Sequence, residues 1–455
     1  MRFDRLCGAR SIPALISFVL TCAALWAGGA VPAGAGTVLL RDAGVEHALS
    51  RLSFPILRAA GLSPRRVRVL VVDDGSLNAF VIDNRAIFIH SGLIMKAGRA
   101  AVLQAVIAHE AAHIANGHLA RRMGNMRAAP GLAGLGAALA VAAAAAGAGE
   151  AAGGIAIGTR SSALRAFLKH TRAEEASADR SAAAYLRGSG VDVQGMVDLH
   201  RMFHGQEMLS VGRQDPYMQS HPLTRDRIRA AESFAAQNGG RAEPDPDAEY
   251  WFARARGKLS AFSRSPKWTM RRAGEERHED IRLMREAVAW HRQRDLARAQ
   301  GAIDAALALR PGDAYYLDLK GRILMENRKW SAALAAYESA ASLAPREALI
   351  RADLGRALLA AGRPDAALAA MEEARERDSR NARLLRDMSI AYAKSAQPGM
   401  AALVTAERYA LEGRFEDAGI HARRAVGQLP RGSVAWQRAQ DVFIASQNHQ
   451  KGKRR

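Results

Sequence analysis

The stretch at positions 105–113 has the form His-Glu-x-x-His within an apolar, alanine-rich segment, and it constrains the chain more than any other feature. Residues four apart on an α-helix share a face, so His109 and His113 can direct two imidazole nitrogens at one point. That point lies at the Zn–N distance of about 2.0–2.1 Å. Glu110 is one step round the helix, placed to reach a water on the metal rather than the metal itself. The spacing predicts two zinc ligands and a general base.

A catalytic zinc site needs a third protein ligand and an open fourth position. The segment 161–186 has a helical pattern and contains Glu174, Glu175 and Asp179. Glu175 and Asp179 are four apart, so we expect Glu175 to be the third ligand and Asp179 to accept a proton from a ligand histidine. Glu174 is the competing choice, rotated by about 100° on the same helix, and it has no such partner. A surface ion pair with a nearby arginine is the alternative role for Asp179.

His221 lies in the loop Ser220-His221-Pro222. Its imidazole can reach the open zinc position, or it can stabilise the oxyanion that develops during catalysis. The alternative interpretation is an ordinary loop residue.

The first 35 residues have the pattern of a signal peptide. Three arginines precede an uncharged, largely apolar run at 12–26, and Ala33-Gly34-Ala35 is a suitable cleavage sequence. Both cysteines of the chain lie in this segment. We therefore expect a periplasmic protein without disulfides.

The formal net charge is +20, which raises the question of an acidic partner. The positive residues are scattered, apart from a compact basic tail at 447–455, and scattered arginine is typical of solvated helix faces. We expect no nucleic-acid partner and retain contact with an anionic membrane surface as a hypothesis. An uncharged run of alanine and glycine at 128–149 allows either membrane contact or packed small-residue helices.

Extended segments are predicted at 67–72, 79–82 and 86–90, directly before the His109 helix, and an amphipathic helix is predicted at 45–62, with Pro55 as a point where it can be interrupted. We expect a metallopeptidase domain at 36–240 and a linker with a short helix at 241–280.

The remainder, 281–446, is predicted to be a helical repeat domain. Several positions recur 34 residues apart, the tetratricopeptide period: Pro311 and Pro345, Gly321 and Gly355, Ala333 and Ala367, Leu334 and Leu368. The segment around Pro398 is expected to break the period. Stacked helix pairs form a curved solenoid whose concave surface suits peptides.

Four segments together resemble a known family: Asn78-Ala79-Phe80, Ser91-Gly92-Leu93, His109-Glu110-x-x-His113 and Glu175-x-x-Ala178-Asp179. They are similar to metallopeptidases related to the CAAX prenyl endopeptidase and HtpX. The exported signal and the repeats resemble the periplasmic branch, the beta-barrel assembly-enhancing proteases. The resemblance covers roughly 67–229 together with the repeats.

The resemblance implies a mainly α fold, in which an α+β gluzincin-type domain with a small sheet precedes an α-solenoid. It implies one Zn²⁺ per chain and endopeptidase activity on unfolded or misassembled envelope proteins, including outer-membrane proteins. His221 corresponds to a loop histidine that restrains activity, and Asn78, Ala79 and Phe80 border the substrate cleft. The repeats would recruit substrates or an assembly machinery. The alternative function is a latent protease that acts chiefly as a chaperone or assembly factor.

Overall fold

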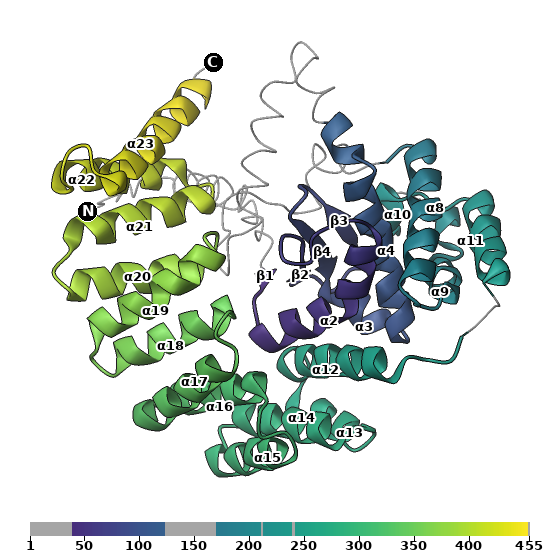
Figure 1. Cartoon of the computed structure of the whole chain (residues 1–455), viewed down its shortest axis with the longest axis horizontal. Helices are drawn as coiled ribbons and strands as arrows, with labels where there is room; N and C mark the ends of the chain where they lie inside the picture. The colour runs from purple at the N-terminus through teal and green to yellow at the C-terminus, as the bar shows by residue number, and fades with distance from the viewer. Residues whose placement is uncertain (1–38, 123–169, 211–212, 239–241, 454–455) are drawn as a thin grey trace, which may run out of the picture. The chain divides into compact units, whose positions relative to one another are not determined.

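The computed structural model describes residues 39–122, 170–210, 213–238 and 242–453. The predicted signal peptide and the uncharged run at 128–149 lie outside these residues. Figure 1 shows the arrangement of the elements. The first part of the chain contains β1 (Leu39–Leu40), α2 (Ala43–Ala59), β2 (Arg68–Val72), β3 (Ala79–Val81), β4 (Ala86–His90), α3 (Ser91–Lys96), α4 (Ala100–Ala115), α8 (Arg172–Gly188), α9 (Gln194–Phe203), α10 (Pro216–Ser220), α11 (Arg225–Gln237), α12 (Pro246–Ser263) and α13 (Pro266–Ala273). A short 3₁₀ turn, Gln206–Met208, precedes α10.

The second part consists of helices that follow one another along the chain (Figure 1). They are α14 (Glu279–Arg292), α15 (Leu296–Leu309), α16 (Ala314–Glu326), α17 (Trp330–Leu343), α18 (Ala348–Ala360), α19 (Pro364–Arg377), α20 (Ala382–Lys394), α21 (Pro398–Leu411), α22 (Phe415–Gln428) and α23 (Val434–Lys453). The predicted fold class is confirmed: the described chain is mainly helical, with one small sheet before the zinc-motif helix. In the described ranges, no helix has both the length and the hydropathy needed to cross a membrane.

The sheet has four strands in the order β1-β2-β4-β3. β2 and β4 are parallel, with Val71 opposite Ile89, whereas β3 runs antiparallel to β4, with Phe80 opposite Phe88. The three predicted strands are present, and β1 adds a two-residue antiparallel strand on the outer side of β2. β3 forms the opposite edge, directly before the strand that leads to α3 and α4.

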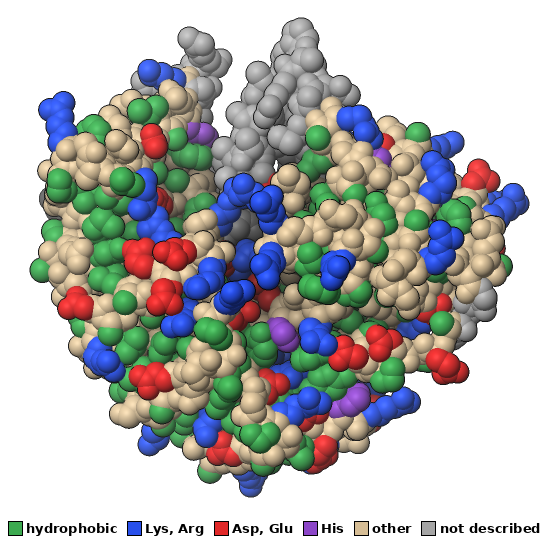
Figure 2. Space-filling model, in the orientation of Figure 1, with side chains coloured by type: hydrophobic (Ala, Val, Ile, Leu, Met, Phe, Trp, Pro, Cys, Tyr) green, Lys and Arg blue, Asp and Glu red, His purple; other side chains and the backbone are tan. Residues whose placement is uncertain are grey.

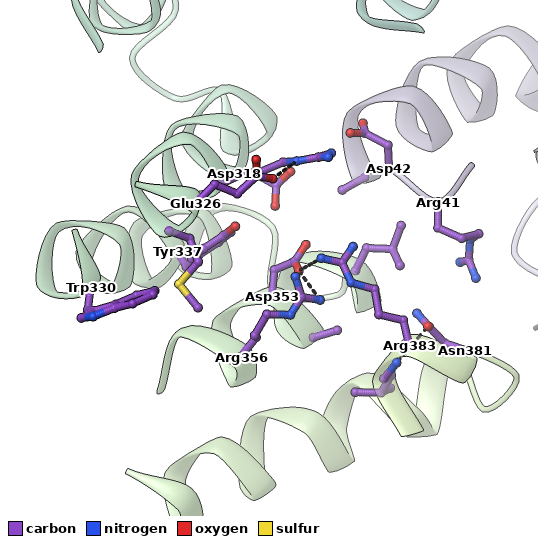
Figure 3. A pocket seen from close by; sticks show the side chains of 16 residues that line it. Arg41, Asp42, Asp318, Glu326, Trp330, Tyr337, Asp353, Arg356, Asn381 and Arg383 are labelled. Carbon is purple, nitrogen blue, oxygen red and sulfur yellow. Dashed lines mark hydrogen bonds and ion pairs between the residues drawn. The ribbon is translucent and has the colours of Figure 1, made fainter. Parts of the chain in front are cut away.

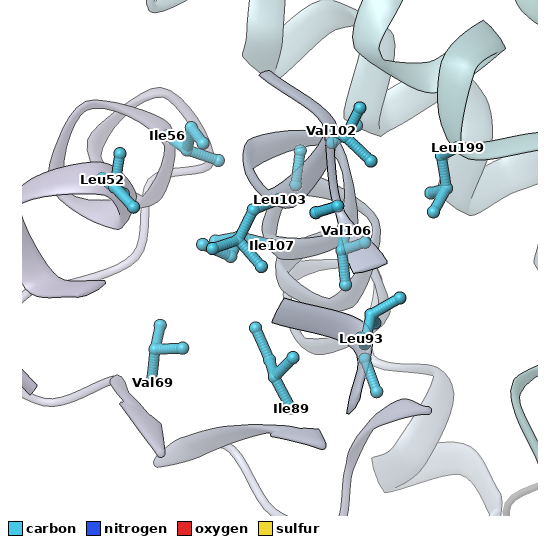
Figure 4. Packing of buried hydrophobic residues seen from close by; sticks show 14 of the residues in the cluster. Leu52, Ile56, Val69, Ile89, Leu93, Val102, Leu103, Val106, Ile107 and Leu199 are labelled. Atoms are coloured by element: carbon cyan, nitrogen blue, oxygen red, sulfur yellow. The ribbon is translucent and has the colours of Figure 1, made fainter. Parts of the chain in front are cut away.

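Helix α4 lies in the centre of the first hydrophobic core. All residues from Ala100 to His113 are buried, so the helix is covered on every side. Figure 4 shows four of its side chains among residues from the sheet and the surrounding helices: Val102, Leu103, Val106 and Ile107 with Leu52, Ile56, Val69, Ile89, Leu93 and Leu199. This burial holds the zinc motif in the interior, where its polar side chains need partners.

Helix α2 continues through Pro55, so the interruption that this proline allows does not occur. Proline removes the N–H that would bond the carbonyl of Arg51. Arg51 lies on the exposed face of the helix, where water can satisfy that carbonyl. Buried residues on the opposite face, among them Leu49, Leu52 and Ile56, keep the helix in place.

The segment assigned to a linker in the sequence analysis contains two helices, α12 and α13. Phe252, Ala255 and Leu259 of α12 belong to the same hydrophobic core as α4. The Glu249 side chain accepts a hydrogen bond from the Ala100 backbone N–H at 2.9 Å and so satisfies a donor at the start of α4. Helix α12 therefore supports the helix that carries the zinc motif.

The repeat period continues further than the sequence suggested. Helices α16, α18 and α20 begin at 314, 348 and 382, and helices α17, α19 and α21 begin at 330, 364 and 398, a constant step of 34 residues. Pro398 does not break the period, because it occupies the first turn of α21, where a missing N–H costs nothing. Gly321 and Gly355 permit close helix approach: a Cβ at these positions would lie 2.9 Å from the Tyr337 ring and 2.5 Å from Met371 Cγ.

Figure 2 shows Lys and Arg side chains over much of the visible face, with Asp and Glu among them. The structure contains many ion pairs between arginines and carboxylates, such as Arg356 with Asp387 at 2.9 Å and Arg375 with Glu407 at 2.7 Å. Much of the positive charge is therefore locally neutralised.

Candidate metal centre

The two histidines of the zinc motif project from α4 toward the same point. His109 Nε2 and His113 Nε2 are 3.1 Å apart, and both residues are buried. Burial lowers the pKa of His113 well below its ordinary value, so this imidazole is neutral and free to donate its lone pair.

The structure separates the two competing glutamates on α8. Thr171 and Glu174 form a capping box at the start of the helix, and Glu174 also pairs with Arg122 at 3.1 Å. Glu175 points the other way and is buried, with Oε1 3.4 Å from His113 Nε2 and Oε2 3.4 Å from His109 Nε2. Glu175 therefore joins the histidines, and Glu174 does not.

The spacing of these three donors fits a zinc ion. Zn–N bonds of 2.0–2.1 Å in a tetrahedron separate neighbouring donor atoms by about 3.3 Å. His109 Nε2 and His113 Nε2 are 3.1 Å apart, and each lies 3.4 Å from a different oxygen of the Glu175 carboxylate. Two imidazoles and one carboxylate are also a donor set found in catalytic zinc sites.

Asp179 lies one turn after Glu175 on α8, and its carboxylate contacts the His109 ring nitrogen that faces away from His113. Its Oδ1 is 3.0 Å from His109 Nδ1. Burial opposes a charge on His109, but the Glu175 and Asp179 carboxylates outweigh it and raise the pKa of this imidazole to about 10. The surroundings of His109 thus stabilise positive charge, which a divalent cation would supply.

Arg227 on α11 is a buried residue of this centre that sequence reasoning missed. Its guanidinium donates two hydrogen bonds to Asp179, at 2.6 and 2.9 Å, and Nη1 lies 2.7 Å from Glu175 Oε2. The positive charges of Arg227 and His109 keep the pKa of Asp179 below its usual range although burial opposes this. The surface ion pair considered for Asp179 is thus replaced by a buried one from a different helix. Thr224, which caps α11, is the local signal that could have placed Arg227 in an ordered first turn.

His221 follows α10 and is the fourth side chain beside His109, His113 and Glu175. Its Nδ1 is 3.0 Å from Glu175 Oε1 and 3.3 Å from His109 Nε2, and the residue is buried. Four side chains, His109, His113, Glu175 and His221, therefore offer donor atoms close enough together to hold one metal ion. His221 stands where a fourth ligand would bind.

Glu110 is 0% exposed, and neither of its carboxylate oxygens has a hydrogen-bond partner among the described residues. Burial raises the pKa of this carboxyl. His221 Nε2 lies 3.4 Å from Glu110 Oε1, too poorly aligned for a hydrogen bond. A buried carboxylate without partners is costly, so its polar ligand is expected to be a molecule bound at the centre.

His118 and His170 surround His113 on its other side. His118 Nδ1 is 2.9 Å from His113 Nδ1, and the His170 ring centroid is 3.7 Å from that of His113. His118 is buried, although its position five residues after His113 suggests the opposite face; Asn116 ends the helix and Gly117 adopts a φ of 66°, which turns the chain back. That Asn-Gly pair was the sequence signal for this return.

The predicted cleft residues lie at the sheet edge. Ala79 and Phe80 belong to β3, Phe80 stacks on Phe88, and Asn78 accepts a backbone hydrogen bond from His90 at 2.9 Å. All three predicted residues are buried. A separate cavity of about 560 Å³ reaches Glu175 and Asp179 from the side of α8 and α11.

Comparison with known proteins places this centre in a family. The model of peptidase family M48 matches residues 40–235, and a tetratricopeptide repeat model matches residues 324–388. Residues 40–235 are a peptidase family M48 domain. The predicted recognition and enzyme class are confirmed at this level: the M48 domain contains the buried His109, His113 and Glu175 cluster.

Two beta-barrel assembly-enhancing proteases are distantly similar to part of the chain. The beta-barrel assembly-enhancing protease of Yersinia pestis is 26% identical over 58% of this chain and 55% of the relative. That of Escherichia coli K12 is 25% identical over 65% of this chain and 61% of the relative. The chain thus spans about half the length of the curated relatives that it matches.

Solved structures of MamA are similar to part of the chain. MamA from Desulfovibrio magneticus RS-1 is 22% identical, with a TM-score of 0.32, and the match covers 36% of this chain and 94% of that protein.

Proposed function

We propose that the M48 domain is a zinc-dependent endopeptidase with one ion per chain, held by His109, His113 and Glu175. The observation that carries the proposal is the convergence of these side chains from α4 and α8, with separations of 3.1–3.4 Å between their donor atoms, close to those around a zinc ion. Asp179 orients His109 through its Nδ1, as outer partners of metal-bound histidines commonly do.

The chemistry assigned to the centre is peptide hydrolysis. Zinc, when bound, acts as a Lewis acid that lowers the pKa of water and polarises the substrate carbonyl. Glu110 takes a proton from the attacking water, whose oxygen forms the new bond to the carbonyl carbon. The C–N bond then breaks, and Glu110 returns that proton to the leaving amine. Burial raises the pKa of Glu110, which makes this carboxylate a stronger proton acceptor.

The substrates we propose are unfolded or misassembled envelope proteins, including outer-membrane proteins. The names of the distant relatives and the presence of repeats beside the M48 domain support this proposal. We propose a periplasmic location, reached by the predicted signal peptide at 1–35. The repeats at 281–446 recruit substrate or an assembly-machinery partner. Substrate enters as an added strand along Asn78, Ala79 and Phe80 at the β3 edge once these buried residues become accessible.

Casein cleavage tests the proposal, with zinc content measured on the same samples. Glu110→Gln is expected to lower kcat on the order of a thousandfold or more while the chain keeps its zinc, because the substitution removes the base and none of the ligands. Full cleavage by this variant would refute the mechanism.

A second candidate function is a latent protease that acts chiefly as a chaperone or assembly factor. The position of His221 favours it, because Nδ1 lies within 3.0–3.3 Å of Glu175 and His109 at the fourth position of the centre. An imidazole bound there would exclude water and substrate until the loop after α10 moved away.

A further inference from the structure

A second polar cavity, of about 300 Å³, lies away from the metal centre. It is lined mainly by the repeat helices α16, α17, α18 and α20, together with the start of α2 (Figure 3). Apolar and aromatic groups, including Trp330 and Tyr337, form part of its wall. This volume is at the lower end of the range for ligand sites.

Asp318 is a carboxyl in this cavity that lacks a partner. The residue is 5% exposed, and its Oδ1 is buried without a hydrogen bond. Figure 3 shows Asp318, Tyr337 and Asp353 directed into the same space. Burial and the neighbouring Asp353 charge raise the pKa of Asp318 well above its ordinary value. A cation that binds beside a buried carboxyl without a partner stabilises its charged form, so cation binding at this position is favourable.

The cations around the cavity are bound to other carboxylates. Arg322 pairs with Glu326 at 3.0 Å, and Lys258 pairs with Asp42 at 2.8 Å. The remaining pairs are Arg356 with Asp353 and Asp387, Arg383 with Asp353, and Arg41 with Glu46 and Asp378. Among the described residues, none forms an ion pair with Asp318 within 4 Å. Each of these cations thus has a carboxylate partner, although Nη1 of Arg41 makes no hydrogen bond, whereas the Asp318 carboxyl has no cationic partner.

A metal ion is a poor match for the unpartnered Asp318 carboxyl. The clusters of the described chain whose donor atoms approach closely enough for a metal are both in the M48 domain, around His113. The carboxylates of the cavity are spread farther apart, and their wall includes aromatic surface. A long organic cation suits both features, because its stem packs on the rings while its charged end reaches Asp318.

We propose that this cavity binds an arginine or lysine side chain of a partner polypeptide, with Asp318 and Asp353 facing its charged end and Trp330 and Tyr337 facing its stem. The pocket would give the repeats a preference for basic segments. This inference concerns recruitment and is independent of the peptidase activity proposed above.

Fluorescence anisotropy tests the proposal on the full chain, in a Glu110→Gln background so that the probe is not cleaved. The probe is a fluorescein-labelled, end-capped glycine-serine peptide with two arginines, and the matched probe carries citrulline, which keeps the shape and lacks the charge. We expect the arginine peptide to bind about tenfold or more tightly than the citrulline peptide. Asp318→Asn should weaken arginine-peptide binding by a similar factor and leave citrulline-peptide binding unchanged.

Two controls keep the result interpretable. Glu338→Gln makes the same charge change at an exposed position of α17 outside the cavity, and it should bind as the parent does. Asp318→Asn removes a buried, unpaired carboxyl, so its Tm should equal or exceed that of the parent, which separates lost binding from lost folding. The proposal is overturned if the arginine peptide does not bind, if both peptides bind equally, or if Asp318→Asn binds the arginine peptide as tightly as the parent.

Discussion

His109 Nδ1 lies 3.0 Å from Asp179 Oδ1, across the contact between α4 and α8. This pair fixes the ring so that Nδ1 carries the proton and Nε2 faces Glu175 and His113. Arg227 in turn holds Asp179 with two hydrogen bonds. The geometry of one ligand therefore depends on residues from three helices.

Replacing Asp179 with Asn should weaken zinc binding by about 10–100-fold, because the amide cannot accept the Nδ1 proton as strongly and no longer favours the required tautomer. Competition with a chromogenic chelator measures the affinity without reference to activity. Glu232→Gln, an exposed change on α11, serves as the control. Equal zinc affinity in Asp179→Asn and the wild type would show that this contact does not orient the ligand.

His221→Ala should increase casein cleavage if the imidazole closes the fourth position. An increase on the order of tenfold is expected if one chain in ten has the loop open at any time. Zinc content should stay at one per chain, since three ligands remain. Unchanged cleavage would count against latency, and reduced cleavage would instead assign His221 to transition-state stabilisation.

Gly355→Ala should destabilise the repeats by about 1–3 kcal/mol, because the added Cβ would lie 2.5 Å from Met371 Cγ and 3.2 Å from the Ala367 carbonyl oxygen. Gly301→Ala is the matched control: it lies in α15 with open space around it and should stabilise by about 0.5–1 kcal/mol. Urea unfolding measures both. Similar shifts for the two variants would contradict the close packing of α18 on α19.

Acidification should weaken the contact of α2 with α16 through His47. The ring accepts from or donates to Tyr315 Oη at 2.7 Å, and burial, together with Arg254 and Arg51, lowers the pKa of His47 to about 4. The unfolded chain, with a pKa near 6.5, binds this proton first, so the stabilisation is complete above about pH 6.5 and is lost as pH falls toward 4.

The expected loss from His47 is about 1–3 kcal/mol between these limits. Unfolding free energies of the wild type and His47→Gln at pH 7.5 and pH 4.5 measure it. The variant should lose less stability on acidification than the wild type. Equal losses would assign the acid sensitivity to other groups.

Local spacing predicts two pairs, His109 with His113 and Glu175 with Asp179, because residues four apart on a helix share a face whatever surrounds the helix. The choice between Glu174 and Glu175 could be predicted from the sequence for the same reason. The meeting of the two pairs depends on how α4 packs against α8. The role of Arg227 could not be predicted from the sequence. Its contact with Asp179 joins residues 48 apart in sequence and depends on how α11 packs against α8.

Element boundaries were less predictable where tertiary packing dominates. Helix α2 passes Pro55 because its buried face outweighs one missing hydrogen bond, and β1 has two residues, too few to show a pattern. The pattern around Pro398 predicts a break in the period, but proline is tolerated at the first position of a helix, and the period continues. In each case, the neighbouring elements determine an outcome that the local sequence leaves open.

Zinc content after mutation of the paired glutamates tests the central claim most directly. Purified Glu175→Gln and Glu174→Gln differ by one position on α8, and metal analysis of both needs no substrate. The account predicts about one zinc per chain for the wild type and Glu174→Gln, and near-complete loss for Glu175→Gln after dialysis. Retention of zinc by Glu175→Gln, or its loss in Glu174→Gln, would contradict the proposed metal centre.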